Sequence, residues 1–159
     1  MTDTDAVTLR KLAPEDESAW FALYSAVRAE ELLMDGWDAA LRDLVLRQQF
    51  DAQRRGNRTR YPASREHLIL VGDRPVGWVV LDRTVPTWRC VDIAIAAEHR
   101  RQGIARGVLR AFQDEAGAAH CAVSLMVLRS NASARALYDD LGFRITGGTE
   151  THWLMEWRE

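Results

Sequence analysis

The residues best placed to do chemistry lie in one basic turn, Arg100–Arg106, between a predicted strand and a predicted helix. Before this turn, Val91, Ile93 and Ile95 alternate with other residues in the period of a strand. After it, four apolar residues share one helical face: Ile104, Val108, Leu109 and Phe112. A helix N-terminus offers unpaired N–H groups and partial positive charge, and Gly103 lets a ligand approach the backbone. The turn is therefore predicted to hold the oxygens of a pyrophosphate group.

The common phosphate-binding motifs do not describe this turn. It has no Gly-Lys-Ser/Thr sequence, which would indicate a P-loop, and no G-x-G-x-x-G, which would indicate a dinucleotide fold. What remains is R-x-x-G-x-A, formed by Arg100–Ala105 directly after a strand that ends at Ile95. This pattern resembles the acyl-CoA signature of the GNAT superfamily of N-acyltransferases, whose form is Q/R-x-x-G-x-G/A.

A second segment resembles the same superfamily. It is Asn131–Phe143, NASARALYDDLGF, which follows the apolar run Ala122–Leu128. The segment is similar to N-x-x-A-x-x-L-Y-x-x-x-G-F, which in the superfamily leads from a strand into a helix that crosses the coenzyme. The residues that match are Asn131, Ala134, Leu137, Tyr138, Gly142 and Phe143. With two motifs in the right order, the chain is identified as a member of the GNAT superfamily.

The resemblance implies that acetyl-CoA is the cosubstrate and that no metal takes part. The positions that match the coenzyme-binding residues are Ile93, Ala94, Ile95, Arg100, Arg101, Gln102, Gly103, Ile104, Ala105, Arg106, Asn131 and Tyr138. In the superfamily a backbone N–H of the fourth strand supports the thioester carbonyl, so the expectation for Ile93–Ile95 concerns their main chain. Asn131 matches a residue that binds the pantetheine arm, but an Asn here could equally cap the following helix.

Tyr138 matches the residue that usually donates a proton to the departing thiolate. A phenol with a pKa near 10 is protonated at neutral pH and can deliver that proton. The alternative is an aromatic side chain that packs beside Leu137 and Leu141 on the helix face.

The general base stays open at this level. Certain peptide-acetylating members of the superfamily have a glutamate on the fifth strand, where this chain has Met126. Asp92 lies in the fourth strand beside the acetyl site, but strict alternation turns it away from the face of Val91 and Ile93. A bulge could restore it, and a structural hydrogen bond is the other reading. The Glu30–Glu31 pair and a chain of water molecules are the remaining candidates.

Length and composition fit one globular domain over residues 1–159, with a polar tail at 1–5. Apolar residues make up 47% and charged residues 28% of the chain, as in ordinary soluble proteins. A net charge of −2 gives no reason to expect a nucleic-acid partner. The arginines at positions 54, 55, 58 and 60 are interpreted as a solvated helix end and loop.

The expected location is the cytoplasm. No apolar run has the length of a membrane span, and the acidic N-terminus lacks the layout of a signal peptide. Cys90 and Cys121 both lie in apolar runs and are predicted to be buried, reduced thiols.

Hydrophobic periodicity predicts an α/β (α+β) fold in the order β-α-α-β-β-β-α-β-α-β-β. The predicted strands are Val7–Leu12, His67–Val71, Val76–Leu81, Trp88–Ile95, Ala122–Leu128, Phe143–Ile145 and Thr151–Trp157. The predicted helices run from Pro14 to Arg28, from Trp37 to Arg55 with Gly56 as a stop, from Gly103 to Ala116 and from Ala132 to Leu141. The superfamily has this order, with a mixed, mostly antiparallel sheet of about seven strands and about four helices. That sheet splays between its fourth and fifth strands, where the coenzyme lies.

The function implied is an N-acetyltransferase that transfers an acetyl group from acetyl-CoA to a primary amine in a ternary complex. The acceptor is a small molecule or a peptide, and a non-catalytic acyl-CoA sensor is the alternative. The residues considered for an acceptor pocket are Met34, Trp37, Phe50, Tyr61, His152 and Trp153, with Trp37 and Phe50 expected in the core. The resemblance is also compatible with a homodimer, for which the closing strands offer a surface.

Overall fold

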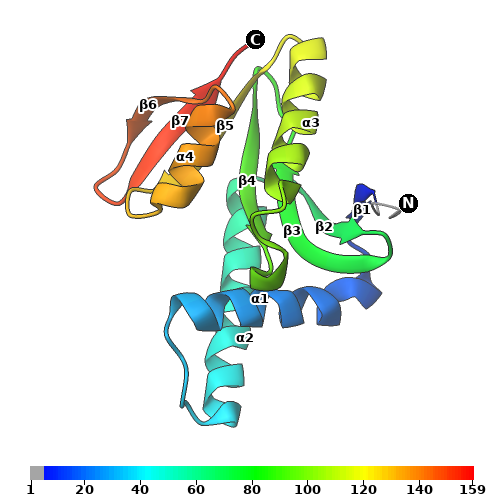
Figure 1. The fold of residues 1–159 in the computed structure, drawn as a ribbon, viewed down its shortest axis with the longest axis vertical. Helices are drawn as coiled ribbons and strands as arrows, with labels where there is room; N and C mark the ends of the chain where they lie inside the picture. Colours follow the sequence, from blue (N-terminus) through cyan, green and yellow to red (C-terminus); the bar gives the residue numbers. More distant parts are fainter. Residues whose placement is uncertain (1–5) are drawn as a thin grey trace.

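The computed structural model describes residues 6–159, which form seven strands and four α-helices in the predicted order (Figure 1). The strands are β1 (Val7–Lys11), β2 (Arg65–Val71), β3 (Arg74–Asp82), β4 (Thr87–Ile95), β5 (Ala122–Leu128), β6 (Arg144–Gly148) and β7 (His152–Trp157). The helices are α1 (Glu17–Glu31), α2 (Ala39–Arg60), α3 (Ile104–Ala118) and α4 (Ala132–Asp140). Two short 3-10 segments, η1 (Pro14–Asp16) and η2 (Ala97–His99), precede α1 and follow β4. The predicted fold class is confirmed.

The strands form a single sheet in the order β1-β2-β3-β4-β5-β7-β6. Within residues 6–159, β4 and β5 are the one parallel pair, and they are hydrogen-bonded only where Thr87–Cys90 lies beside Ala122–Leu125. Both strands continue beyond this ladder, β4 to Ile95 and β5 to Leu128. We call this opening, between Val91–Ile95 and Met126–Leu128, the fork.

Helices cover the sheet on both faces, and each face has its own core. On one face α3 and α4 pack over the centre, and the buried residues of α3 include Ile104, Val108, Leu109 and Phe112, as the helical spacing predicts. On the other face α1 and α2 pack against β2 and β3 around Trp20, Tyr24, Phe50 and Trp78. Phe50 is 1% exposed, so its predicted core position is confirmed.

A bulge in β4 changes which side chains reach each face. Val80 of β3 pairs with Asp92 and Leu81 pairs with Cys90, so Val91 is the extra residue. As a result Val91 packs with the α1–α2 core whereas Ile93 packs with the α3–α4 core. Asp92 also faces the α1–α2 side, because its carboxylate is bound by Trp78 and by Gln53 of α2. Strict alternation was therefore the wrong assumption for this strand.

Two further expectations are wrong. Gly56 does not stop the second helix, which continues to Arg60. A helical glycine costs only about 1 kcal/mol, and the helix ends instead at Tyr61, whose φ of −131° is extended because Pro62 follows it. Trp37, expected in the core, is 45% exposed just before α2, whereas Met34 is 1% exposed.

Cys90 and Cys121 are buried free thiols, as predicted. No helix in the described residues combines the length and the apolar character needed to cross a membrane.

Candidate active site

The basic turn forms a cradle of free backbone N–H groups. Gly103 caps α3 in the left-handed conformation with a φ of 78°, and Arg101 has a φ of 62°. Within residues 6–159, the N–H groups of residues 101–106 donate no hydrogen bond. Six consecutive unpaired N–H groups at the N-terminus of a 15-residue helix fit the negatively charged oxygens of a pyrophosphate. Gly103 is needed for its backbone conformation, since a β-carbon there would meet no atom within 4 Å.

Two arginine side chains of this turn, Arg100 and Arg106, already have partners within the protein. The Arg100 Nε donates to the Ile95 carbonyl at 3.0 Å, and its Nη1 donates to the Glu30 carboxylate of α1 at 3.1 Å. Arg106 forms an ion pair of 3.1 Å with Asp140 of α4. Arg101 and Gln102 are exposed. The geometry thus favours the backbone, assisted by Arg101, as the anion-binding part of the cradle.

Main-chain groups of β4 face the fork. Ala96 N–H donates to the Val76 carbonyl, and hydrogen bonding in an antiparallel ladder alternates from residue to residue. The N–H and C=O groups of Ile93 and Ile95 therefore point away from β3, toward the side where β5 has diverged. Ala94 faces β3, and its carbonyl lies so close to Gly77 that no β-carbon would fit there.

Tyr138 lies on the α3–α4 side of the sheet, in the same core as Cys90 and Ile93 of β4. It is 7% exposed and packs edge-on against Phe143, with ring centroids 6.0 Å apart. Burial, and then the nearby Cys90 thiol and Asp92 carboxyl, raise the pKa of the phenol well above its ordinary value. The hydroxyl is consequently protonated at neutral pH and available as a proton donor. Tyr138 also packs in the core, as the alternative reading of the sequence expects, and its role as proton donor stays a prediction.

Asp92 lies on the opposite side of the sheet, facing α1 and α2. Its Oδ2 accepts hydrogen bonds from Trp78 Nε1 at 2.7 Å and from Gln53 Nε2 at 3.1 Å. Oδ1 has no side-chain donor among the described residues. Burial raises the pKa of this carboxyl, the hydrogen bond from Trp78 lowers it in part, and the negative charge of Glu31 raises it further. Both the bulge and the structural hydrogen bond that the sequence left as alternatives are present.

Glu30 and Glu31 have cationic partners, unlike Asp92. Glu30 pairs with Arg100, and Glu31 pairs with Arg28 at 2.8 Å. No arginine, lysine or histidine of residues 6–159 forms an ion pair with Asp92. Of the three carboxylates considered as a base, Asp92 is the one that is partly buried, close to Tyr138 and free of a cation.

The sequence did not reveal the residues that hold Asp92. Trp78 comes from β3 and Gln53 from α2, and neither belongs to a motif. Tyr24 of α1 joins the same polar group, because the charges of Arg28 and Asp92 act on its hydroxyl. Only the packing of α1 and α2 on the sheet brings these side chains together.

Asn131 caps α4. Its side-chain oxygen accepts a hydrogen bond from the Ala134 N–H at 3.1 Å, and the residue is exposed. The capping role that the sequence offered as one of two readings is therefore present in the structure.

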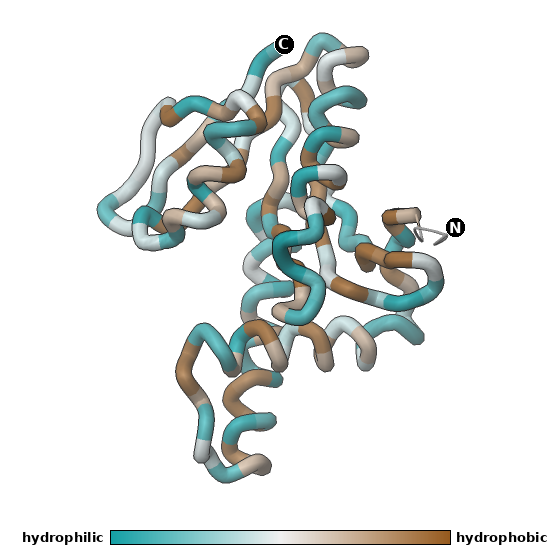
Figure 2. The backbone as a smooth tube through the Cα atoms, viewed as in Figure 1, coloured by the Kyte–Doolittle hydropathy of each residue, from teal (hydrophilic) through white to brown (hydrophobic). Residues whose placement is uncertain are grey.

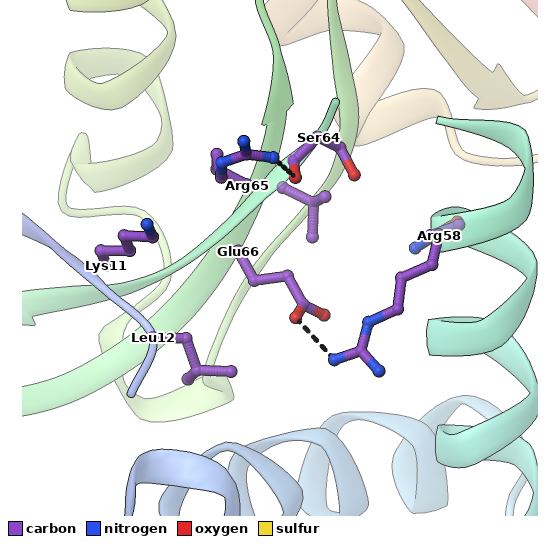
Figure 3. Close-up of a pocket in the computed structure, with 8 residues that line it drawn as sticks. Lys11, Leu12, Arg58, Ser64, Arg65 and Glu66 are labelled. Carbon is purple, nitrogen blue, oxygen red and sulfur yellow. Dashed lines mark hydrogen bonds and ion pairs between the residues drawn. The ribbon is translucent and has the colours of Figure 1, made fainter. Parts of the chain in front are cut away.

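Two cavities lie elsewhere, and no predicted site residue lines either of them. One, of about 120 Å³, lies between Lys11, the end of α2 and the start of β2. Figure 3 shows Glu66 and Arg58 pointing toward one another there, an ion pair of 3.3 Å. The other, of about 220 Å³, lies between β1 and α3. The described residues also bring together no group of three His, Cys, Asp or Glu side chains that could hold a metal ion.

The model of the acetyltransferase (GNAT) family matches residues 22–143. No curated protein sequence matches the chain.

Several solved structures share the fold at low sequence identity. PaiA N-acetyltransferase from Thermoplasma acidophilum, in complex with coenzyme A, has a TM-score of 0.75 and 14% identity over 97% of this chain and 99% of that one. Spermidine N-acetyltransferase from Vibrio cholerae, in complex with CoA and spermine, has a TM-score of 0.65 and 20% identity over 96% and 95%. The ribosomal-protein-S18-alanine N-acetyltransferase from Escherichia coli has a TM-score of 0.65 and 17% identity over 96% and 94%.

Proposed function

Because this chain belongs to the GNAT acetyltransferase family, we propose that it transfers an acetyl group from acetyl-CoA to a primary amine. Transfer is direct, in a ternary complex of the protein with both substrates. The proposal rests chiefly on one observation, which is that Asp92 and Tyr138 flank the fork from opposite faces of the sheet. A proton acceptor and a proton donor are what transfer between an amine and a thiol ester requires.

The cradle and the fork would hold the donor substrate. The free N–H groups of residues 101–106 bind its pyrophosphate, and the N–H groups of Ile93 and Ile95 in the fork orient its thioester and polarise the carbonyl. Asn131 can take part from the α4 side while it caps that helix. The pyrophosphate and thioester roles use backbone N–H groups, whereas the Asn131 role uses a side chain.

Asp92 and Tyr138 would carry the proton transfers. Oδ1 of Asp92 accepts a proton from the acceptor ammonium, directly or through water, which leaves a neutral amine. The amine nitrogen forms a bond to the acetyl carbon as the carbon–sulfur bond breaks, and Tyr138 donates its proton to the departing sulfur. The cationic amide nitrogen then loses its extra proton through water, and this proton restores the Tyr138 phenolate to the phenol. A carboxyl with a raised pKa is the better base at neutral pH, and a protonated phenol is a competent acid.

The chemical class of the amine acceptor is inferred from proteins of similar fold rather than from residues of the site. The spermidine enzyme acts on a small polyamine and the S18-alanine enzyme on a protein, so the fold accommodates both kinds of amine. We place the reaction in the cytoplasm, where acetyl-CoA is available.

A non-catalytic acyl-CoA sensor is the second candidate, favoured by Met126 standing on β5 where some relatives have a glutamate. Tyr138 and the partly buried Asp92 count against it, because a sensor has no use for a proton donor and acceptor at the fork.

The first test is thermal unfolding with and without acetyl-CoA, with ATP and NAD as controls. A ligand at about a hundred times its dissociation constant adds roughly 2.7 kcal/mol to native stability. We expect the midpoint to rise with acetyl-CoA alone. A screen of amines, read by thiol release, then separates the enzyme from the sensor, because a sensor would bind acetyl-CoA and release no thiol with any acceptor.

A further inference from the structure

β5 is apolar on both of its faces, although only one face belongs to a helical core. All of its residues except Ser124 are apolar, and Figure 2 shows the strand in apolar colours along most of its length. Val123, Leu125 and Val127 pack in the α3–α4 core. Apolar residues on both faces are typical of a strand that is buried on both. The other face of β5 therefore carries apolar side chains that the α3–α4 core does not explain.

Three apolar side chains on that other face form a surface beside the fork, which we call the apolar wall: Met126 and Leu128 of β5 and Leu154 of β7. Met126 and Leu154 are direct partners in the β5–β7 ladder, and alternation points both toward the α1–α2 side. Both are partly exposed, and Leu128 is 47% exposed. Within residues 6–159, neither helical core includes any of the three. The apolar wall is thus available to a molecule that enters the fork from the α1–α2 side.

The apolar wall lies across the fork from Asp92. The β4–β5 ladder ends with Cys90 beside Leu125, and both of these side chains belong to the α3–α4 core. Val91 and Met126 come next, and both face the α1–α2 side, as Asp92 does. The base of the proposed reaction and the apolar wall therefore lie on the same face of the sheet, on the two strands that border the fork.

The other carboxylates near this face already have cationic partners. The two at the end of α1 each pair with an arginine. Glu156, two residues along β7 from Leu154, pairs with Arg158 at 2.6 Å. Asp92 remains, and the proposed reaction uses it for the ammonium that reacts. A second ammonium on the acceptor would therefore find no free carboxylate among these groups, whereas an apolar group would find the apolar wall.

We propose that the apolar wall selects the acceptor, which is a primary amine carried by an apolar group rather than a polyamine. Such an amine occurs in an alkylamine and at the N-terminus of a peptide that begins with an apolar residue. With the amine at Asp92, the group next to it contacts Met126, and Leu154 and Leu128 extend this contact. The three are specificity-determining residues and take no part in proton transfer. This inference rests on the proposed function, because it describes the acceptor of the same reaction.

A matched pair of amines tests the proposal, since hexylamine and 1,6-diaminohexane differ by one ammonium. We expect kcat/KM, read by thiol release from acetyl-CoA, to be roughly tenfold or more higher for hexylamine, because an ammonium without a partner is costly to desolvate. From ethylamine to hexylamine, kcat/KM should rise by up to about fourfold for each methylene that the apolar wall buries. A parent protein that prefers the diamine, or does not distinguish the two, overturns the proposal.

Met126→Glu should reverse this preference, because the new carboxylate can pair with the second ammonium. The readout is the ratio of the two kcat/KM values, from which any general change in proton transfer cancels. Met126 is partly exposed, so the variant keeps the fold. Leu44→Glu adds the same charge at a position of α2 that is 56% exposed, and it should leave the ratio unchanged. An unchanged ratio in Met126→Glu, or an equal change in Leu44→Glu, counts against the apolar wall.

Leu154→Ala separates this inference from the proposed function. It should lower kcat/KM for hexylamine roughly tenfold, and change it little for ethylamine, whose chain is too short to cover the apolar wall. Turnover of both amines without any dependence on Leu154 would overturn this inference alone. Absence of thiol release with every amine would overturn the proposed function and this inference together.

Two tripeptides extend the comparison to a peptide source of the same amine. Leu-Gly-Gly should be acetylated with a higher kcat/KM than Lys-Gly-Gly, which carries a second ammonium in place of the apolar end. The better of Leu-Gly-Gly and hexylamine identifies the source of the acceptor. A preference for the lysine peptide would contradict the proposal for either source.

Discussion

Asp92 and Tyr138 stand on opposite faces of the sheet at the point where β4 and β5 part. Asp92 is held from the α1–α2 side by Trp78 and Gln53, and Tyr138 packs in the α3–α4 core. Burial raises the pKa of Tyr138, and the Cys90 thiol and the Asp92 carboxyl raise it further. A donor substrate seated in the fork would therefore meet a base on the acceptor side and an acid on the thiol side. The first two predictions follow from this separation.

Tyr138→Phe should reduce kcat by roughly 10²- to 10⁴-fold, the usual contribution of a general acid. Affinity for acetyl-CoA should change little, because Phe preserves the packing against Phe143. Steady-state kinetics and calorimetric titration measure the two effects separately. Tyr61→Phe is the control, because it removes a phenol hydroxyl at the C-terminal end of α2, where the ring lies against Arg60 and Arg89. Equal turnover in both variants would exclude Tyr138 as the proton donor.

Asp92→Asn should lower kcat/KM and abolish the acidic limb of its pH profile, since Asn can still accept from Trp78 and Gln53 but cannot take a proton. In the parent the midpoint of the acidic limb should lie at a pH above 3.8, the ordinary pKa of an aspartate, because burial raises the Asp92 pKa. Trp78→Phe removes a hydrogen bond that lowers this pKa, so the limb should move to higher pH. A limb that survives in Asp92→Asn would assign the base to another group or to water.

The same variant separates loss of chemistry from loss of fold. The pKa of Asp92 is higher in the folded protein than in the unfolded chain. Between these two pKa values the folded protein therefore holds the Asp92 proton more tightly than the unfolded chain does. Its contribution to stability is therefore present at low pH and lost as pH rises through the two values. Urea unfolding across this range should show a shallower pH dependence in Asp92→Asn and no loss of stability at neutral pH.

Gly103→Ala should weaken acetyl-CoA binding, because Ala resists the φ of 78° that aims the cradle N–H groups. We expect a dissociation constant raised about tenfold, with roughly 1 kcal/mol lost from the free energy of unfolding. Gly56→Ala is the matched control, since this helical glycine has no positive φ and a β-carbon there meets nothing within 4 Å. It should stabilise α2 by up to about 1 kcal/mol and leave binding unchanged. Unaltered binding in Gly103→Ala would place the pyrophosphate elsewhere.

Gly77→Ala should destabilise the fold by roughly 1–3 kcal/mol, since the added β-carbon would collide with the Ala94 carbonyl, a backbone atom that cannot move away alone. The collision would displace Ile93–Ile95, so acetyl-CoA binding should weaken as well. Gly147→Ala adds a β-carbon 3.8 Å from Leu154, an ordinary contact, and serves as the control. Denaturant titration of both variants measures the difference. Equal midpoints would show that β3 and β4 can separate locally.

The order of elements could be predicted because strand and helix periods are local properties of the chain. The cradle could be predicted for the same reason, since Gly103 and the residues around it are consecutive. The partners of Asp92 could not, because Gln53 is 39 residues away and meets it only after α2 packs on the sheet. A bulge near Asp92 could be named as an alternative but not chosen, since its presence depends on the register between β3 and β4. The predicted burial of Trp37 was wrong because an apolar residue type does not show whether another element covers the side chain.

The short ladder between β4 and β5 has a mechanical meaning. Within residues 6–159, the backbone ladder that connects β1–β4 with β5–β7–β6 has four residue pairs, so the sheet consists of two parts joined at one end. The α3–α4 core contains side chains from both parts of the sheet, and their packing holds the two parts at a fixed separation. A molecule bound along the fork would contact both parts of the sheet and restrict their relative motion. The rigidity of the whole protein would then depend on whether the fork is occupied.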